Sequence, residues 1–329
     1  MIRATLLPHL LLGLMLAGCA SSPTEIRKES VPEEVQREKD LQAADQRRRD
    51  FRMLLLQLDQ AIDSYVHALA ARGEPRADAQ AERLERSIRE MVLDRGPVVY
   101  GREASGSENG KNFGLLQAAA VDGTVAADQA IALAALGFSG VNSVMPTILA
   151  GAQLEDPFVA DRAVLGLAIL RAPGTPPGVF ARIVEDPKHP EDGRVQAAWA
   201  LYQMQGVSED QGPYVTIYRR LLTEKRDLMP AGVLVSAVRG LGYVRDEKNC
   251  DVVAPMLGNP VPRLRMAACV ALARMNGQKY APDLIERIGP KESVQNVRLT
   301  ARKALAELAG GNDYGYDVDA WRKAFERGQ

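Results

Sequence analysis

The stretch that decides the fold is RLRMAACVALARM at residues 263–275, because variants of it recur along the chain. Five similar segments are DQAIALAALG (128–137), DRAVLGLAIL (161–170), RVQAAWALYQM (194–204), LVSAVRGLGYV (234–244) and VRLTARKALAEL (297–308). Aligning their small residues Ala130, Ala163, Ala197, Ala237, Ala268 and Ala301 gives spacings of 33, 34, 40, 31 and 33 residues. A period this steady predicts stacked supersecondary units.

Each of these Ala-rich segments has the spacing of an amphipathic helix, and a second apolar helix precedes it. The preceding segments are VMPTILAG (144–151), GVFARIVED (178–186), YVTIYRRLLT (214–223), CDVVAPMLGN (250–259) and YAPDLIERIG (280–289), and the short FGLLQAAAVDG (113–123) is the first helix of the first unit. A single helix pair cannot bury its apolar face, so the units must stack. We therefore predict an all-α fold, an α-solenoid of about six helical hairpins over residues 113–310.

A turn acid or amide followed by an arginine marks four of the predicted units. The pairs are Asp156 with Arg162, Asp186 with Arg194, Asn259 with Arg265, and Glu292 with Arg298. In this pattern the units resemble the HEAT repeats of bacterial HEAT-domain proteins. The resemblance implies that these residues form a structural ladder of charge-assisted hydrogen bonds between neighbouring turns. A functional basic stripe is the alternative role for the arginines.

The C-terminal segment, residues 311–329, differs from the units in its aromatic content. Tyr314, Tyr316, Trp321 and Phe325 lie close together there. The segment resembles the tail that closes many bacterial HEAT-repeat arrays. An end repeat exposes apolar surface, which a short aromatic helix can cover. We therefore expect a C-terminal cap, with a ligand-stacking site as the alternative.

The N-terminus has the pattern of an export signal. Arg3 precedes an apolar run that is too short to span a bilayer. The run ends in Leu-Ala-Gly-Cys, which resembles the bacterial lipobox and implies removal of residues 1–18 and acylation of Cys19. The expected location is the bacterial cell envelope, anchored to the lipid membrane through Cys19. No aspartate follows the cysteine, which favours the outer membrane facing the periplasm if the cell is Gram-negative.

Three further segments separate the anchor from the repeats. Residues 19–48 are polar and are predicted to form a flexible, disordered tether, with a nascent helix from Glu33 onward as the alternative. Residues 49–97 contain two apolar-periodic runs and are predicted to form an amphipathic helical hairpin, with a coiled-coil-like stalk as the alternative. Residues 98–112 form a predicted Gly-rich loop. Its Gly110-Lys111 pair lacks the preceding glycine and the following hydroxyl residue of a phosphate-binding loop, so no nucleotide cofactor is expected.

Charge and composition narrow the classes of partner. The 41 basic and 42 acidic side chains nearly cancel, so nucleic acid is not an expected partner. After the leader only His67 and His189 remain among the histidines, and no metal centre or other cofactor is expected. Cys250 and Cys269 lie on the two helices of one unit. Whether they form a disulfide or stay free stays open at this point.

The expected function is that of a membrane-anchored scaffold for protein–protein interaction. The groove lined by the second helices would bind an unidentified envelope protein or peptide. We expect no enzymatic activity, because the sequence offers no clear pair of nucleophile and base. The alternatives are a HEAT-like enzyme, an accessory subunit of an envelope enzyme, and a structural spacer.

Overall fold

The computed structural model describes residues 32–70, 75–94 and 110–326. In these ranges the regular structure consists of α-helices and short 3₁₀ turns, without a strand, which confirms the prediction of an all-α solenoid. The chain divides into two compact units, residues 1–49 and 50–329. The signal segment and Cys19 lie outside the described residues.

The described part of the first unit is helical. Helix α1 (Glu33–Ala70) begins there, so the segment predicted as a tether is helical from Glu33 onward, where the sequence indicates a nascent helix. Two acidic residues in the first turn, Glu33 and Glu34, complement the helix dipole. Hydrogen bonds of Gln36 to Asp40 (3.0 Å) and of Gln42 to Glu38 (3.5 Å) follow the i, i+4 spacing. Local propensity therefore extends the helix through a polar sequence.

In the second unit, α1 from Asp50 onward is followed by helix α2 (Pro75–Leu93), where the sequence predicts a hairpin over 49–97. The buried residues of α1 in this part are Leu55, Leu58, Ile62, Tyr65 and Ala68. They recur at intervals of three or four residues, which places them on one helix face. Ile88 and Val92 of α2 are fully buried in the same core. The connection at residues 71–74 lies outside the described ranges.

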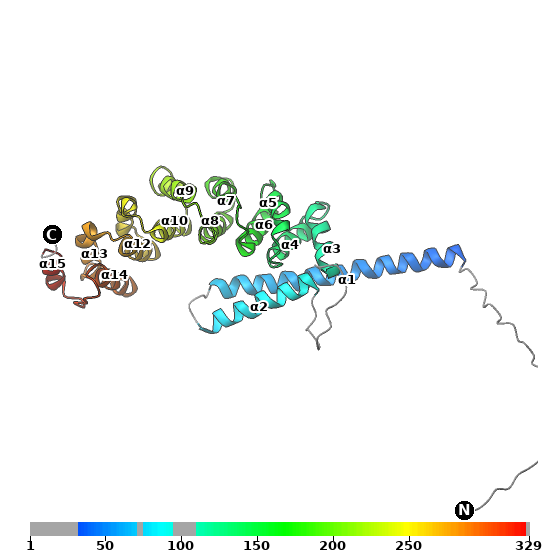
Figure 1. The fold of residues 1–329 in the computed structure, drawn as a ribbon, viewed down its shortest axis with the longest axis horizontal. Helices are drawn as coiled ribbons and strands as arrows, with labels where there is room; N and C mark the ends of the chain where they lie inside the picture. Colours follow the sequence, from blue (N-terminus) through cyan, green and yellow to red (C-terminus); the bar gives the residue numbers. More distant parts are fainter. Residues whose placement is uncertain (1–31, 71–74, 95–109, 327–329) are drawn as a thin grey trace, which may run out of the picture. The chain divides into compact units, whose positions relative to one another are not determined.

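Six helical hairpins form the array. They pair α3 (Gly110–Val121) with α4 (Ala126–Gly137), α5 (Met145–Gly151) with α6 (Pro157–Leu170), α7 (Pro177–Glu185) with α8 (Glu191–Gln205), α9 (Gly212–Thr223) with α10 (Ala231–Val244), α11 (Cys250–Val253) and its 3₁₀ extension Ala254–Gly258 with α12 (Pro262–Arg274), and α13 (Ala281–Ile288) with α14 (Gln295–Leu308). The first helices α5, α7 and α9 stand in one row and the second helices in another (Figure 1). Helix α3 begins at Gly110, so the end of the predicted loop over 98–112 is helical.

Small residues set the spacing between neighbouring second helices. The six aligned alanines are at most 1% exposed. Helices α4 and α6 approach so closely that a Cβ atom on Gly137 would overlap the backbone of Gly166. A larger side chain at either position would separate the two hairpins. The repeated Ala and Gly of the sequence are thus the contact points that let one hairpin stack on the next.

Helix α15 (Val318–Glu326) follows the last hairpin and packs against α13. Its Trp321 is fully buried and donates a hydrogen bond from Nε1 to the Gly315 carbonyl at 3.0 Å. The Trp321 and Tyr314 rings form an edge-to-face pair with centroids 5.0 Å apart, and the Trp321 and Phe325 rings are stacked with centroids 6.3 Å apart. These contacts cover the end of the array, because the aromatic rings replace the next hairpin that a repeat would need.

Candidate binding face of the helical array

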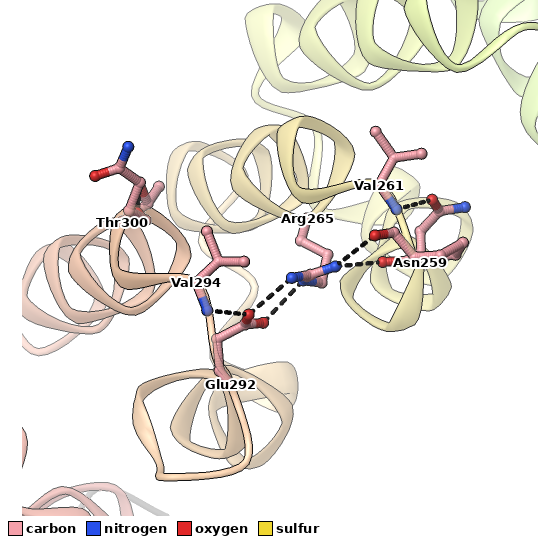
Figure 2. A network of polar contacts seen from close by, with 8 residues as sticks. Asn259, Val261, Arg265, Glu292, Val294 and Thr300 are labelled. Carbon is pink, nitrogen blue, oxygen red and sulfur yellow. Dashed lines mark hydrogen bonds and ion pairs between the residues drawn. The ribbon is translucent and has the colours of Figure 1, made fainter.

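Arg265 and Glu292 connect the fifth and sixth hairpins. The guanidinium donates to the two carboxylate oxygens at 2.8 and 2.7 Å and to the Asn259 carbonyl at 2.8 Å (Figure 2). Burial raises the pKa of Glu292, but the hydrogen bonds from Arg265 and from the Val294 amide outweigh it and leave this pKa below its ordinary value. The carboxylate is therefore ionised at neutral pH and holds the two hairpins together.

The arginines at 194 and 298 bind carbonyl groups and not the acids that the sequence pairs with them. Arg194 donates to the Val184 carbonyl at 2.9 Å, and Arg298 donates to the Ile288 carbonyl at 3.1 Å. Both carbonyls lie in the last turn of a first helix, where no intrahelical donor remains. The predicted ladder of acid–arginine pairs is therefore wrong at these two positions.

The two acids that the sequence pairs with these arginines, Asp186 and Glu292, bind other groups. Asp186 accepts a hydrogen bond from the Lys188 amide at 2.9 Å, which stabilises the turn before α8. Glu292 is already bound by Arg265 and does not pair with Arg298. Arg298 instead lies over the ring of Tyr316, whose centroid is 4.9 Å from its guanidinium carbon. Arg194 and Arg298 therefore bind the first helix of their own hairpin, through partners that sequence spacing alone does not identify.

Asp156 and Arg162 are also separate in the structure. Asp156 is the N-cap of α6 and accepts from the Phe158 amide at 2.9 Å. Arg162 points to α1 and pairs with Asp59 at 3.0 Å and Asp63 at 2.9 Å. Sequence analysis misses this interaction, although the i, i+4 spacing of the two aspartates places both on one side of α1.

The N-terminal hairpin covers the second helices α4 and α6. Every residue from Gln129 to Ser139 is buried. Tyr65 of α1 meets the Phe138 ring edge-on at a centroid distance of 5.1 Å. Arg89 of α2 donates to the Phe138 carbonyl at 3.0 Å. Together with the Arg162 ion pairs, these contacts show that the first part of the second-helix row already has a helical partner within the chain.

Farther along the row, the second helices α8, α10, α12 and α14 present an exposed surface, which we call the second-helix face. Its apolar members are Val195, Trp199, Tyr243, Met266, Val270 and Leu299, and its cations are Arg239, Arg263, Arg274 and Lys303. Tyr243, Val270 and Leu299 are 44%, 38% and 39% exposed. None of the four cationic side chains bonds to a described residue. Asp192 and Glu307 are the acids at equivalent positions of these helices.

A second candidate for a binding site is a hollow of about 410 Å³ between the first helices α7 and α9. Its charged residues already have partners. Glu185 pairs with Arg220 and lies 3.4 Å from Lys225 Nζ, while Arg182 donates to the Ala152 carbonyl at 2.6 Å. A ligand there would have to displace these contacts, whereas the cations of the second-helix face are available. The second-helix face is therefore the stronger candidate for a binding surface.

The side chains that could take part in catalysis, one histidine and two cysteines, occupy structural positions in the fold. His189 lies with Nε2 2.7 Å from Asp161 Oδ1, linking the turn before α8 to α6. Burial raises the pKa of Asp161 in spite of this contact. Cys250 and Cys269 are free and buried, and burial raises their thiol pKa values to about 11 and about 12. Both thiols are therefore protonated at neutral pH, and neither is suited to act as a nucleophile.

The described residues contain no group of three or more His, Cys, Asp or Glu side chains arranged to hold a metal ion. None of their helices has both the length and the apolar content required to cross a membrane. Neither observation bears on residues 1–31, where the sequence predicts a lipobox.

Comparison with known proteins identifies the repeats. Residues 221–306 match the family model of HEAT repeats, from the end of α9 to near the end of α14. The array is thus a helical repeat scaffold of the HEAT type over this span. No curated protein matches the chain. A solved structure that does match is human deoxyhypusine hydroxylase in complex with glycerol, at 15% identity, with 84% of this chain and 98% of that chain covered and a TM-score of 0.27.

The prediction that this chain has no enzymatic activity is contradicted by that match, since the similar structure is itself an enzyme. The lack of a clear nucleophile and base in the sequence does not exclude catalysis, because a helical repeat scaffold can hold other kinds of site. A TM-score of 0.27 assigns no reaction, substrate or cofactor to this chain. The comparison therefore removes the prediction without replacing it by an activity.

Proposed function

We propose that this protein is a lipid-anchored scaffold that binds a partner protein of the cell envelope along its second-helix face. The observation that carries the proposal is the combination of exposed apolar side chains, such as Val270 and Leu299, with four cations that bond to no described residue. Apolar surface rimmed by polar residues is typical of a protein interaction site. A face that only spaced the array from the membrane would not need it.

The anchor in this proposal is Cys19. It follows Leu16, Ala17 and Gly18 at the end of a short apolar run, in the position that a lipobox cysteine occupies. Acyl chains on one residue anchor a protein stably when several are attached, because each buried methylene contributes about 0.8 kcal/mol. The outer membrane facing the periplasm is the proposed location if the cell is Gram-negative, since no aspartate follows Cys19.

Anchoring is tested by replacing Cys19 with Ala and separating membrane from soluble proteins. The proposal predicts that the wild-type chain sediments with membranes and that the variant moves to the soluble fraction. Replacing the buried Cys269 with Ala serves as the control, because it removes a cysteine without touching the anchor. Membrane retention of the Cys19→Ala variant would contradict lipid anchoring.

Partner binding is tested by placing a photo-crosslinking amino acid, p-benzoylphenylalanine, at Val270 or Leu299 in the anchored protein within cells. Both side chains are exposed on the second-helix face. The same amino acid at Thr216, exposed on the first helix α9, is the matched control. The proposal predicts a discrete crosslinked partner protein from the first two positions and not from Thr216. Equal crosslinking at all three positions, or none at Val270 and Leu299, would reject the face as the binding surface.

A further inference from the structure

Helix α1 provides a template for what the second-helix row can bind. Leu58 and Ile62 of α1 are fully buried, and its Tyr65 packs edge-to-face with Phe138, the residue after α4. Beside this apolar stripe, Asp59 and Asp63 pair with Arg162 of α6. The row thus accepts a helix that presents apolar residues together with carboxylates one turn apart.

The second-helix face repeats both features of that contact without a partner among the described residues. On α12, Met266 and Val270 lie between Arg263 and Arg274 at helical spacing, and on α14 Leu299 lies one turn from Lys303. Arg239 adds a cation on α10. This face carries four cations and two acids, Asp192 and Glu307, so its net charge is positive. Such a surface is complementary to an acidic, partly apolar partner.

We propose that the second-helix face binds an amphipathic helix of a partner protein, with carboxylates flanking its apolar stripe, in the manner in which α1 covers α4 and α6. This inference rests on the proposed function and specifies the chemistry of the partner. A helix fits better than an extended peptide, because a row of helices offers no sheet edge for main-chain hydrogen bonds. A helix fits better than lipid headgroups, because headgroups leave Val270 and Leu299 without apolar contacts.

The test uses the full mature chain with Cys19 replaced by Ser and a labelled helical peptide of about 20 residues, which spans about 30 Å. The peptide carries Leu at positions i, i+3, i+4 and i+7 with Glu on both sides of this stripe. Its affinity is measured by the fluorescence anisotropy of the peptide label. A second peptide replaces every Glu by Lys and keeps the apolar stripe.

The expected result is that the Glu peptide binds the chain and that the Lys peptide binds at least tenfold more weakly. The double variant Arg239→Glu/Arg274→Glu should weaken Glu-peptide binding at least tenfold, because two attractions become repulsions. The control variant Lys188→Glu/Lys323→Glu changes the net charge equally at exposed positions outside this face and should leave the affinity within twofold. Equal binding of both peptides, or equal loss in both variants, would overturn the inference.

Two further outcomes separate the possible failures. If Val270 crosslinks a partner in cells but the Glu peptide does not bind, the proposed function stands and the helix chemistry is wrong. If vesicles of equal parts phosphatidylglycerol and phosphatidylcholine displace the Glu peptide, and do so only with Arg239 and Arg274 intact, the face recognises anionic lipid and the inference is overturned. Persistence of peptide binding in the presence of these vesicles supports a protein partner.

Discussion

Arg265 of α12 and Glu292, in the turn before α14, form two hydrogen bonds of 2.8 and 2.7 Å across the boundary between two hairpins. The side chains are only 11% and 3% exposed. Because the pair is buried, neither group can exchange its partner for water without a large cost. The two residues therefore couple the fifth and sixth hairpins more strongly than a surface ion pair could.

Replacing Glu292 with Ala should lower the free energy of unfolding by about 3 kcal/mol, because it leaves the Arg265 charge buried without its carboxylate. Urea denaturation followed by circular dichroism measures this change. Asp319→Ala, which breaks the exposed pair with Arg322, is the control and should cause no measurable loss. Equal stability of the Glu292 variant and the wild type would show that the pair does not couple the hairpins.

The contribution of Glu292 should depend on pH in one direction. Its pKa is below the ordinary value of 4.5 in the folded chain, so its stabilisation is fully present above pH 4.5 and is lost as the pH falls through the folded pKa. The difference in free energy of unfolding between wild type and Glu292→Gln should therefore shrink between pH 6 and pH 3. A difference that stays constant, or grows with acid, would contradict the ion pair as its source.

The attachment of the N-terminal hairpin should depend on Arg162. Arg162→Ala removes both ion pairs to α1 and should accelerate amide hydrogen exchange at residues 55–68 by about tenfold, since local opening becomes easier. Exchange in α12 and α14 should stay as in the wild type. Arg322→Ala, at the far end of the array, is the matched control. Unchanged exchange in α1 would mean that apolar packing alone holds the hairpin.

The C-terminal cap should depend on Trp321. Trp321→Ala removes a fully buried ring and should lower the free energy of unfolding by about 3–5 kcal/mol, with the loss confined to the last hairpins. Tyr316→Ala is the control, because Tyr316 is 41% exposed and contacts Arg298 and Arg302 at the surface. Thermal denaturation compares the two variants. A larger loss of stability from Tyr316→Ala than from Trp321→Ala would show that Trp321 is not the residue that holds the cap.

The array can be predicted well from the sequence, because similar Ala-rich helical segments recur along it at nearly regular intervals. The aligned alanines, such as Ala197 and Ala268, recur once in each hairpin, at the position where one second helix packs on the next. They are buried there, as that packing requires. The start of α1 is harder to predict, because the polar residues after Glu33 suit a disordered segment and an exposed helix equally well. Only the gain from local hydrogen bonds and the helix dipole favours the helix.

The partners of the arginines are harder still to predict. Arg162 binds Asp59 and Asp63, which are about a hundred residues away along the chain, so no local spacing encodes the contact. Arg194 and Arg298 bind backbone carbonyls, which every residue has and which no sequence pattern singles out. The sequence predicts that the second helices line the binding surface, and burial shows which side of each second helix is covered. The spacing of apolar residues predicts which side of a helix is buried, but not which element packs against it.

The most direct test of the central claim, that partners bind the second-helix face, is amide hydrogen exchange of the purified crosslinked complex against the free chain. The account predicts added protection in α8, α10, α12 and α14 and unchanged exchange in the first helices α7 and α9, because a bound partner would order and cover only the second-helix row. Protection confined to α7 and α9, beside the hollow between them, would contradict it.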